Sequence, residues 1–382
     1  MHTFGDRAIK NSVLSNFFKG KAIIIIGPRQ VGKTTFANTI IRTYEDNGVK
    51  VLRINCDNPT DREVLTDKDL SFLEKLVGDA RVIFIDEGQK VSTIGQTIKL
   101  LIDRFGTEKQ IFVTGSSSFH LLNHTQEALT GRKYVYSLYP LAFLELYKDT
   151  PLTAQKELST HLIYGSYPDV INQASFAEKR EVITELASSK LYKDILEFQD
   201  IRNSNVLHTL LKALALQVGS EVSYTELANT VGIDKNTVER YIDLLEKSFI
   251  LFRLPPYFVN KRKEIRKSKK IYFYDTGIRN SIIQNFNPLD ARDDRGVLWE
   301  NFLIVERMKR NEYRRLMPHS YFWRTYGQQE IDYVEEYDGV LSGYEFKFSD
   351  KKQPKPPTGW ITNYKDAMYS VITPENYLDF IV

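Results

Sequence analysis

A single cysteine, Cys56, is present among the 382 residues of the chain. One cysteine excludes a disulfide within the chain and most zinc sites, and it is typical of a protein in a reducing compartment. Its expected role is that of a small, buried, apolar side chain. No run of apolar residues approaches the length of a membrane-spanning helix, and the N-terminal sequence lacks the apolar core of a signal peptide. We therefore expect a cytoplasmic protein with no membrane partner.

An excess of one charge is also missing, because 52 Lys and Arg residues face 49 Asp and Glu residues, a formal net charge of +3. Such a balance does not by itself indicate a nucleic-acid partner, so a partner of that kind has to be inferred from local clusters of charge. Hydrophobic residues make up 42% and charged residues 26%, the proportions of an ordinary globular protein. A chain of this length predicts two or three domains with cores of their own.

What the sequence does have is a phosphate-binding pattern near its start. The apolar, β-branched run Ile23–Ile26 predicts a strand that is buried on both faces. The motif Gly27-x-x-x-x-Gly32-Lys33-Thr34 follows it, and then a stretch with helical character. The two glycines let successive backbone N–H groups turn toward one centre, and the N-terminus of the helix adds the positive end of its dipole. We interpret this stretch as the phosphate loop of a nucleotide site.

The chemistry of this loop predicts ATP and Mg²⁺ as cofactors. Lys33 supplies a cation for the outer phosphates, and the hydroxyl of Thr34 is a ligand for Mg²⁺. The opposing interpretation, a glycine turn that binds nothing, is disfavoured because every position of the motif is matched. We expect the nucleotide to contact the continuous segment Gly27, Pro28, Arg29, Gln30, Val31, Gly32, Lys33, Thr34 and Thr35.

An acidic pair follows the strand predicted at Arg81–Asp86, whose sequence is RVIFID. Asp86 and Glu87 come at the carboxyl end of this strand, where a doubly wound sheet presents its ligands. We predict that Asp86 holds Mg²⁺, and that Glu87 takes a proton from the water attacking the γ-phosphate or orients that water. The alternative is a surface acidic pair that caps the following helix.

Two further residues are candidates for the same site. Ser116 follows the fourth predicted strand and could sense the γ-phosphate, or it could belong to a turn that caps the next helix. Arg132 follows a Thr-Gly turn and could act as an arginine finger on the nucleotide of its own or a neighbouring subunit, or it could be a solvated side chain. The order of the predicted elements gives an α/β nucleotide domain with a mostly parallel sheet over residues 1–146.

These motifs together resemble those of one family. The GPRQVGKTT of the loop, the IDE of residues 85–87, the TGSSS of residues 114–118 and the LTGR of residues 129–132 look like those of a family of prokaryotic AAA-type ATPases. The resemblance covers nearly the whole chain. It implies a P-loop NTPase fold of the AAA (ASCE) type, ATP hydrolysis, and the finger role of Arg132. It also implies a C-terminal domain of uncharacterised function that often contains a restriction-endonuclease-like fold.

The first part of the middle segment is predicted to be helical. Residues 147–204 are expected to form a helical lid or linker, because related ATPases carry a small helical lid at this position. Residues 205–268 resemble a winged helix, since two predicted helices, joined by a tight turn at Gly232, precede a strand. The second of these helices, DKNTVERYIDLLEKS, would be the recognition element.

Two groups of residues make DNA the expected partner of this segment. The outer face of the second helix carries Lys235, Asn236, Thr237 and Arg240, which could meet DNA. The run NKRKEIRKSKK that follows is the only strong local cluster of positive charge in the sequence, and it suits contacts with phosphates. A winged helix can also dock a protein, and a basic run can be a solvated turn. The side chains of this run expected to contact DNA are Lys261, Arg262, Lys263, Arg266 and Lys267.

Residues 269–382 are expected to form an α/β domain that resembles restriction-endonuclease-like nucleases. Asp332 on one predicted strand and Glu345-x-Lys347 on the next resemble their Asp…Glu-x-Lys core, and Glu300 matches the glutamate that those folds often carry on a helix. The three carboxylates are the expected ligands of Mg²⁺ or Mn²⁺. A lysine on the same face can orient or deprotonate the attacking water, which makes Lys347 a catalytic candidate.

Two interpretations of the whole chain stay open. In one, a Mg²⁺-dependent ATPase is coupled to a C-terminal half that binds DNA and cleaves it with a metal ion. In the other, ATP switches the shape of an interaction protein whose C-terminal domain is catalytically inactive and docks a protein or DNA. In that second case, Glu345 and Lys347 are an ion pair. An assembly of several copies is compatible with both interpretations.

Overall fold

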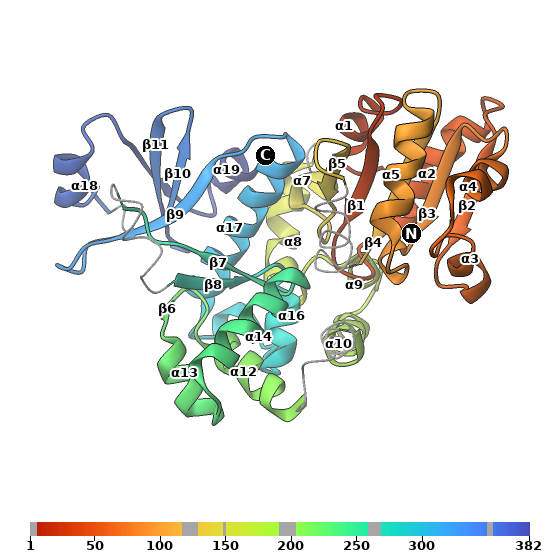
Figure 1. The fold of residues 1–382 in the computed structure, drawn as a ribbon. Coiled ribbons are helices and arrows are strands. Elements are labelled where there is room, and N and C mark those ends of the chain that lie inside the picture. The colour runs from red at the N-terminus through yellow and green to blue at the C-terminus, as the bar shows by residue number, and fades with distance from the viewer. Residues whose placement is uncertain (1–5, 117–128, 148–149, 191–203, 259–268, 350–353) are drawn as a thin grey trace. The chain divides into compact units, whose positions relative to one another are not determined.

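The chain folds into two compact units (Figure 1). Unit 1 comprises the residues up to Pro140 together with Lys247–Phe249, and unit 2 comprises Leu141–Glu246 and Ile250–Val382. The finer division into four segments stays a prediction. The computed structural model describes residues 6–116, 129–147, 150–190, 204–258, 269–349 and 354–382.

Unit 1 is built on a parallel sheet. Its strands in the described residues are β1 (Ala22–Ile26), β2 (Val51–Asn55), β3 (Val82–Asp86), β4 (Gln110–Gly115) and β5 (Lys133–Ser137). They run in the order β2-β3-β4-β1-β5, and every neighbouring pair is parallel. β1, β3 and β4 are buried along their whole length, which explains their apolar sequences. The predicted parallel α/β sheet, which fits a P-loop NTPase, is confirmed.

Helices connect β1 to β4 along the chain, as parallel pairing requires (Figure 1). They are α2 (Lys33–Glu45), α3 (Pro59–Glu63), α4 (Leu70–Val77) and α5 (Ile94–Phe105), and the short α1 (Lys10–Leu14) precedes β1. α5 has the bounds that its apolar periodicity predicts, and it buries Ile94, Ile98 and Leu101 along one face. In the described part of the chain, no helix combines the length and the apolar character that crossing a membrane requires.

Most of unit 2 is helical. Its helices in the described residues are α7 (Phe143–Tyr147), α8 (Pro151–Tyr164), α9 (Pro168–Ile171), α10 (Phe176–Glu185), α12 (Ser204–Leu216), α13 (Tyr224–Val231), α14 (Lys235–Lys247), α16 (Thr276–Ile282), α17 (Arg295–Tyr313), α18 (Thr358–Asn363) and α19 (Tyr377–Ile381). A single long helix is predicted over 177–198, but α10 ends at Glu185 and one π-helical turn, Leu186–Lys190, follows it. The rest of that prediction lies outside the described residues.

A small antiparallel sheet joins three short strands of unit 2. They are β6 (Glu221–Val222), β7 (Leu251–Leu254) and β8 (Lys269–Phe273), and β8 lies between the other two. β6 precedes α13, and β7 follows α14 along the chain. β8 lies just beyond the boundary predicted at residue 268, yet it completes this sheet.

One local prediction in this region is wrong. The sequence Asp275-Thr276-Gly277 predicts a turn, but α16 begins there instead. The side chain of Asp275 accepts a hydrogen bond from the backbone N–H of Ile278 at 3.1 Å and so caps the helix. Aspartate is favoured both in turns and at helix N-termini, so the local sequence does not separate the two outcomes.

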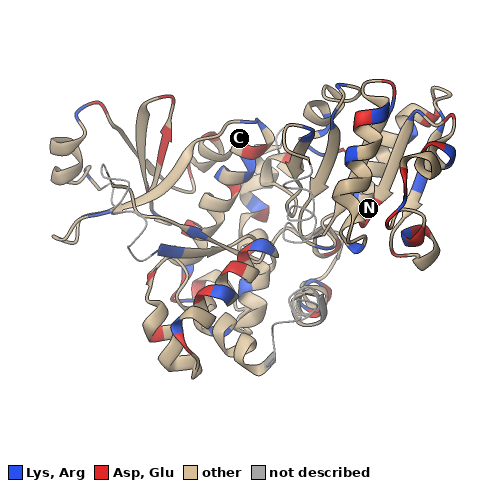
Figure 2. Cartoon of the chain, in the orientation of Figure 1, with Lys and Arg blue, Asp and Glu red and all other residues tan. Residues whose placement is uncertain are grey.

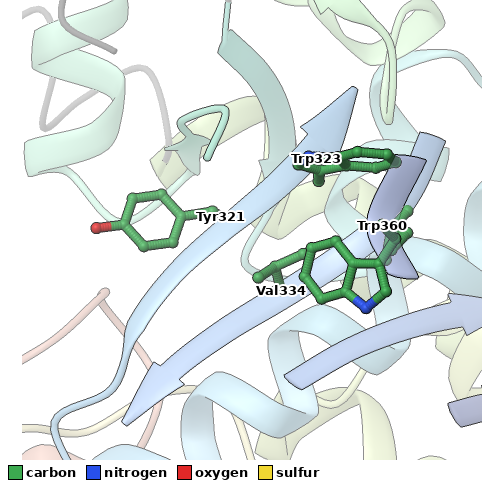
Figure 3. Packing of buried hydrophobic residues seen from close by; sticks show 5 residues of the cluster. Tyr321, Trp323, Val334 and Trp360 are labelled. Carbon is green, nitrogen blue, oxygen red and sulfur yellow. The ribbon is translucent and has the colours of Figure 1, made fainter. Parts of the chain in front are cut away.

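Unit 2 also contains a four-stranded mixed sheet. Its strands in the described residues are β9 (His319–Arg324), β10 (Glu330–Tyr337), β11 (Val340–Phe346) and β12 (Met368–Ile372), in the order β12-β11-β10-β9. Only β11 and β12 pair in parallel. The core on one face gathers Tyr321, Trp323, Ile331, Val334 and Trp360 (Figure 3). The rings of Trp323 and Trp360 meet edge to face with their centroids 5.5 Å apart, which fixes α18 against this sheet.

Candidate functional site

The phosphate loop turns tightly between β1 and α2. Gly27 follows β1 with φ +155°, and a Cβ atom at this position would lie 2.0 Å from the carbonyl oxygen of Leu138. No other residue fits there without moving the backbone of the neighbouring chain segment. Gly32 has φ +89° and is the last residue before α2 begins at Lys33. The predicted residues Gly27–Thr35 therefore form one continuous strand–loop–helix connection.

Lys33 spans this loop from the first turn of α2. Its side chain is 5% exposed, and its ammonium donates hydrogen bonds to the carbonyl oxygens of Gly27 at 3.0 Å and Pro28 at 2.7 Å. The cation is thus held over the loop and close to the N-terminus of α2. A phosphate bound there meets both the ammonium and the helix dipole.

Thr34 and Asp86 meet at the carboxyl edge of the parallel sheet. The hydroxyl of Thr34 lies 3.2 Å and 3.0 Å from the two carboxylate oxygens of Asp86. The hydroxyl of Thr114, at the end of β4, also donates to Asp86, whose side chain is buried. A hydroxyl and a carboxylate beside the phosphate loop are the oxygen ligands that Mg²⁺ takes in P-loop enzymes. The residues present therefore fit the predicted ion.

Glu87 stands next to this pair in a strained conformation. Its φ is +54°, which a residue with a side chain rarely adopts and which clusters at functional sites. Its backbone N–H donates to the hydroxyl of Thr114 at 3.4 Å. This backbone turn directly follows the end of β3 at Asp86.

Gln89 connects Glu87 to Ser116, a role that the sequence does not predict. Its side-chain amide lies in the short 3-10 helix Gly88–Lys90 and donates both to the carboxylate of Glu87 and to the hydroxyl of Ser116, the latter at 2.8 Å. Ser116 is 2% exposed. The structure thus brings the predicted general base and the predicted sensor to one amide. The only hint of this role in the sequence is that Gln89 comes two residues after Glu87.

A buried guanidinium supports the loop from the N-terminal segment. Arg7 is 2% exposed and donates to the carbonyl oxygens of Val31 at 2.9 Å and Tyr139 at 2.8 Å. These partners lie 24 and 132 residues away in sequence. Arg7 therefore fixes the backbone of the phosphate loop against the end of the sheet, and no local pattern indicates it.

Arg132 lies at the opposite end of the sheet from the loop. β5 runs parallel to β1 and pairs Ala22 with Lys133, so Arg132 precedes the start of both strands. Five strand residues separate this end from the loop, a distance of about 16 Å. The guanidinium is 41% exposed and pairs with Asp103 at 2.7 Å. An arginine finger acting on its own subunit does not fit this position, and a role toward a neighbouring subunit stays a prediction.

In unit 2 the structure groups Asp332, Glu345 and Lys347. β10 and β11 pair Tyr333 with Tyr344, so the next positions along the ladder, Asp332 and Glu345, lie opposite each other. Asp332 accepts a hydrogen bond from the backbone N–H of Phe346 at 2.8 Å, and Glu345 accepts one from the ammonium of Lys347 at 2.7 Å. Burial raises the pKa of both carboxyl groups, and their mutual repulsion raises the pKa of Glu345 further.

Glu300, the third predicted metal ligand, is held by protein groups. It lies on α17, and its Oε1 accepts hydrogen bonds from Tyr272 at 2.6 Å and Lys270 at 3.3 Å. Burial raises the pKa of Glu300 to about 7, although the ammonium of Lys270 acts in the opposite direction. In the described residues, no three Asp, Glu, His or Cys side chains come together as a metal-binding group. Lys270 and Tyr272 thus already engage Glu300, and a metal site that includes all three carboxylates stays a prediction.

Asp332 and Glu345 are the two predicted ligands that lie together in the structure. Mg²⁺ is often bound by one or two carboxylates, with waters and phosphate oxygens as the remaining ligands. A hollow of about 630 Å³ lies beside Lys347 and gives such a phosphate room to approach. Its lining residues are Arg292, Asp293, Arg295, Gly296, Lys347, Phe348 and Ser349.

Four of the predicted nucleic-acid residues lie in the first two turns of α14. Lys235, Asn236 and Arg240 are exposed. Thr237 is half-buried, and Asp234 accepts both its backbone N–H at 2.9 Å and its hydroxyl at 2.5 Å, so Thr237 serves the helix cap. Figure 2 shows acidic and basic residues interspersed along α14. The predicted contacts Lys261, Arg262, Lys263, Arg266 and Lys267 lie outside the described residues.

Comparison with protein families supports the nucleotide site. Residues 19–147 match the family model of an AAA domain. Residues 155–289 and 295–377 match two domains of unknown function, DUF8612 and DUF4143. With the loop geometry above, the first match supports an AAA-type P-loop ATPase domain in residues 19–147.

The chain is also similar over most of its length to proteins of other microbes. It is 26% identical over 332 residues to an uncharacterised protein of Mycobacterium tuberculosis, covering 86% of this chain and 70% of that protein. It is 24% identical over 304 residues to an uncharacterised protein of Haemophilus influenzae, covering 75% and 74%. Among solved structures, the replication initiator DnaA bound to AMPPCP and single-stranded DNA aligns with a TM-score of 0.31 at 16% identity, covering 62% of this chain and 86% of that one. Nothing further follows from so low a score.

Proposed function

We propose that this chain is a Mg²⁺-dependent ATPase whose nucleotide state controls nucleic-acid binding by unit 2. The observation that carries the ATPase part is the contact of Thr34 with both carboxylate oxygens of Asp86, beside the ammonium of Lys33. These groups stand at the carboxyl edge of a parallel sheet, where P-loop enzymes bind the phosphates and the metal ion.

Each residue of the site has its own role in ATP hydrolysis. Lys33 neutralises charge on the outer phosphates, and Thr34 and Asp86 hold Mg²⁺, which withdraws charge from the phosphate oxygens. Glu87 accepts a proton from the attacking water or orients it, as a carboxylate within reach of that water can do. The amide of Gln89 holds the carboxylate of Glu87 in position, and Ser116 in turn accepts a hydrogen bond from this amide.

ATP hydrolysis by a Lys33→Ala variant tests the ATPase proposal. The variant should lose about 10²-fold in rate, because it removes a preorganised charge from the transition state. Lys50→Ala is a matched control, since Lys50 lies on the surface of the same unit and pairs with a surface carboxylate, Asp79. Equal rates for the two variants would refute a nucleotide site at this loop.

The DNA-binding part of the proposal rests on features of unit 2. An antiparallel sheet of three strands, with α13 and α14 between its first two, is the element order of a winged helix. Lys235, Asn236 and Arg240 are exposed at the start of α14, where a recognition helix meets base edges. The basic residues Lys261, Arg262, Lys263, Arg266 and Lys267 add charge suited to phosphates.

The salt dependence of DNA binding tests this part. Replacing Lys261, Arg262, Lys263, Arg266 and Lys267 by glutamine should weaken binding to a DNA duplex. It should also lower the slope of log K against log salt by about 0.9 for each phosphate that the variant no longer neutralises. Neutralising five surface lysines of unit 1 is the control for net charge. A slope that falls equally in both proteins would remove the basic run from DNA binding.

A second candidate activity is cleavage of nucleic acid by unit 2. It is favoured by Asp332 and Glu345 facing each other across two strands with Lys347 beside them. The measurement is cleavage of plasmid and linear DNA with Mg²⁺ or Mn²⁺, with and without ATP, against Lys347→Ala. Cutting that disappears in the variant supports a nuclease. No cutting, with ATP hydrolysis intact, favours the alternative of an ATP-switched protein whose C-terminal domain only docks a partner.

A further inference from the structure

Lys270 is a buried cation that the proposed chemistry does not use. Its side chain is 3% exposed, and its ammonium lies 2.6 Å from a carboxylate oxygen of Glu330 and 3.3 Å from one of Glu300. Two carboxylates thus contact this ammonium directly, and their negative charges favour its protonated form.

Three elements of unit 2 meet at this ammonium. Lys270 lies on β8, the central strand of the small antiparallel sheet, whereas Glu300 lies on α17 and Glu330 on β10 of the mixed sheet. The hydroxyl of Tyr272, two residues along β8, donates to the same oxygen of Glu300 at 2.6 Å. The small sheet therefore supplies both protein donors that engage Glu300.

The carboxylates of the cluster differ in their direct contacts. Glu300 and Glu330 face the fixed ammonium, and Glu330 also lies 3.7 Å from the guanidinium of Arg324. Asp332 and Glu345 face each other across β10 and β11 on the side of Lys347. A cation beside Glu300 and Glu330 would be repelled by an ammonium already in contact with both, and such repulsion is strong where water is excluded.

We infer that Lys270 takes the place of a second metal ion, so that the cluster binds one divalent cation, on Asp332 and Glu345, with Glu300 outside its ligand set. This inference rests on the metal site of the proposed nuclease. It narrows that site to one ion, and it makes Lys270 a positioning residue that ties the small sheet to the site. The single ion and Lys347 are then the groups that meet a phosphate.

The test counts Mn²⁺ ions bound per chain by electron paramagnetic resonance, on full-length protein without nucleotide. An Asp86→Asn background in every sample removes the carboxylate of the phosphate-loop site. The parent should bind one ion, and Asp332→Asn should weaken its binding by about tenfold or more. Lys270→Met should bind a second ion, because Glu300 and Glu330 lose their fixed cation. Lys269→Met, at the preceding position of β8, is the matched control and should keep the parent's single ion.

Glu300→Gln gives a second test that does not depend on Lys270→Met folding. Since Glu300 is inferred not to be a ligand, this variant should bind its single ion within about threefold of the parent's affinity. Combined with Lys270→Met, it should abolish the second ion.

The outcomes separate this inference from the proposal beneath it. One ion in the parent and an unchanged count in Lys270→Met would overturn the inference and leave the metal site standing. A drop in affinity of about tenfold or more in Glu300→Gln would also overturn it, because Glu300 would then be a ligand. No ion in the parent or in Lys270→Met would refute the metal site and the inference together.

Discussion

The hydroxyl of Thr34 contacts both carboxylate oxygens of Asp86, at 3.2 Å and 3.0 Å, across 52 residues of sequence. The two residues come from different elements, the start of α2 and the end of β3. The parallel order β3-β4-β1 places those element ends at the same edge of the sheet. A metal ion held there by both residues is fixed relative to the phosphate loop, which is the geometry that P-loop hydrolysis requires.

Thr34→Ala should therefore weaken ATP binding in the presence of Mg²⁺ by about tenfold and leave binding in EDTA nearly unchanged. The physical reason is that only the metal-dependent part of the affinity passes through this hydroxyl. Titration of a fluorescent ATP analogue under both conditions measures the difference. Thr39→Ala is the control, since Thr39 is half-buried on α2 and its hydroxyl donates to the carbonyl oxygen of Thr35. Equal reductions in affinity with and without Mg²⁺ would contradict a metal role for Thr34.

Glu87→Gln should lower the rate of ATP hydrolysis by about 10²-fold or more while keeping ATP bound, because it removes a base and little binding surface. Gln89→Ala should lower the rate by about tenfold, since Glu87 then loses the amide that holds it. Single-turnover hydrolysis and ATP binding, measured on the same samples, separate the two effects. Lys90→Ala is the matched control, because Lys90 is the next residue and pairs with Asp57 on the surface. A Gln89→Ala rate equal to that of the control would show that the amide does not position Glu87.

Arg7→Ala should lower the free energy of unfolding of unit 1 by about 3 kcal/mol, because two buried carbonyl oxygens lose their donor. One of them belongs to Val31 in the phosphate loop, so ATP affinity should fall as well. Urea denaturation with and without ATP measures both quantities. Lys10→Ala is the control, since its surface ion pair with Asp6 contributes about 0–1 kcal/mol. A variant as stable as this control would mean that water replaces the guanidinium without cost.

The phosphate loop could be predicted from the sequence because its residues are contiguous. The glycines, Lys33 and Thr34 act within one turn of chain, and the carboxylate of Asp86 is marked by the apolar strand before it. Gln89 could not be predicted, because its role depends on Ser116, 27 residues away on another strand. The role of Arg7 is even harder to predict, since its two acceptors come from segments that only the folded sheet brings together.

Contacts between residues that are distant in sequence also determine the surroundings of Glu300. Its helix and the strands of Asp332 and Glu345 follow from periodicity and turn signals, and the structure has elements at these places. The sequence pattern does not contain the pairing of β8 with β6 and β7, which presents Lys270 to the cluster. A charge 30 residues from Glu300 thus changes which carboxylates can bind a metal ion.

The final prediction concerns pH and a buried histidine of unit 2. His161 is 1% exposed, and its ring nitrogens contact the hydroxyls of Ser166 at 2.8 Å and Tyr147 at 2.9 Å. Burial lowers the pKa of His161 from 6.5 to about 3, and the ammonium of Lys309 acts in the same direction. Below pH 6.5 the unfolded chain therefore binds a proton at this position that the folded chain does not bind. His161 thus lowers the stability of the fold as pH falls, down to its folded pKa.

Between pH 7 and pH 5.5, this proton should cost the wild type about 1 kcal/mol of unfolding free energy. His161→Gln keeps a polar side chain that does not titrate in this range, so its stability should fall by about 1 kcal/mol less over the same interval. Urea denaturation at the two pH values gives both differences. His208→Gln is the control, because it makes the same substitution at an exposed position of α12. If His161→Gln and His208→Gln showed the same pH dependence, His161 would be protonated in the folded state, and its pKa would not be lowered by burial.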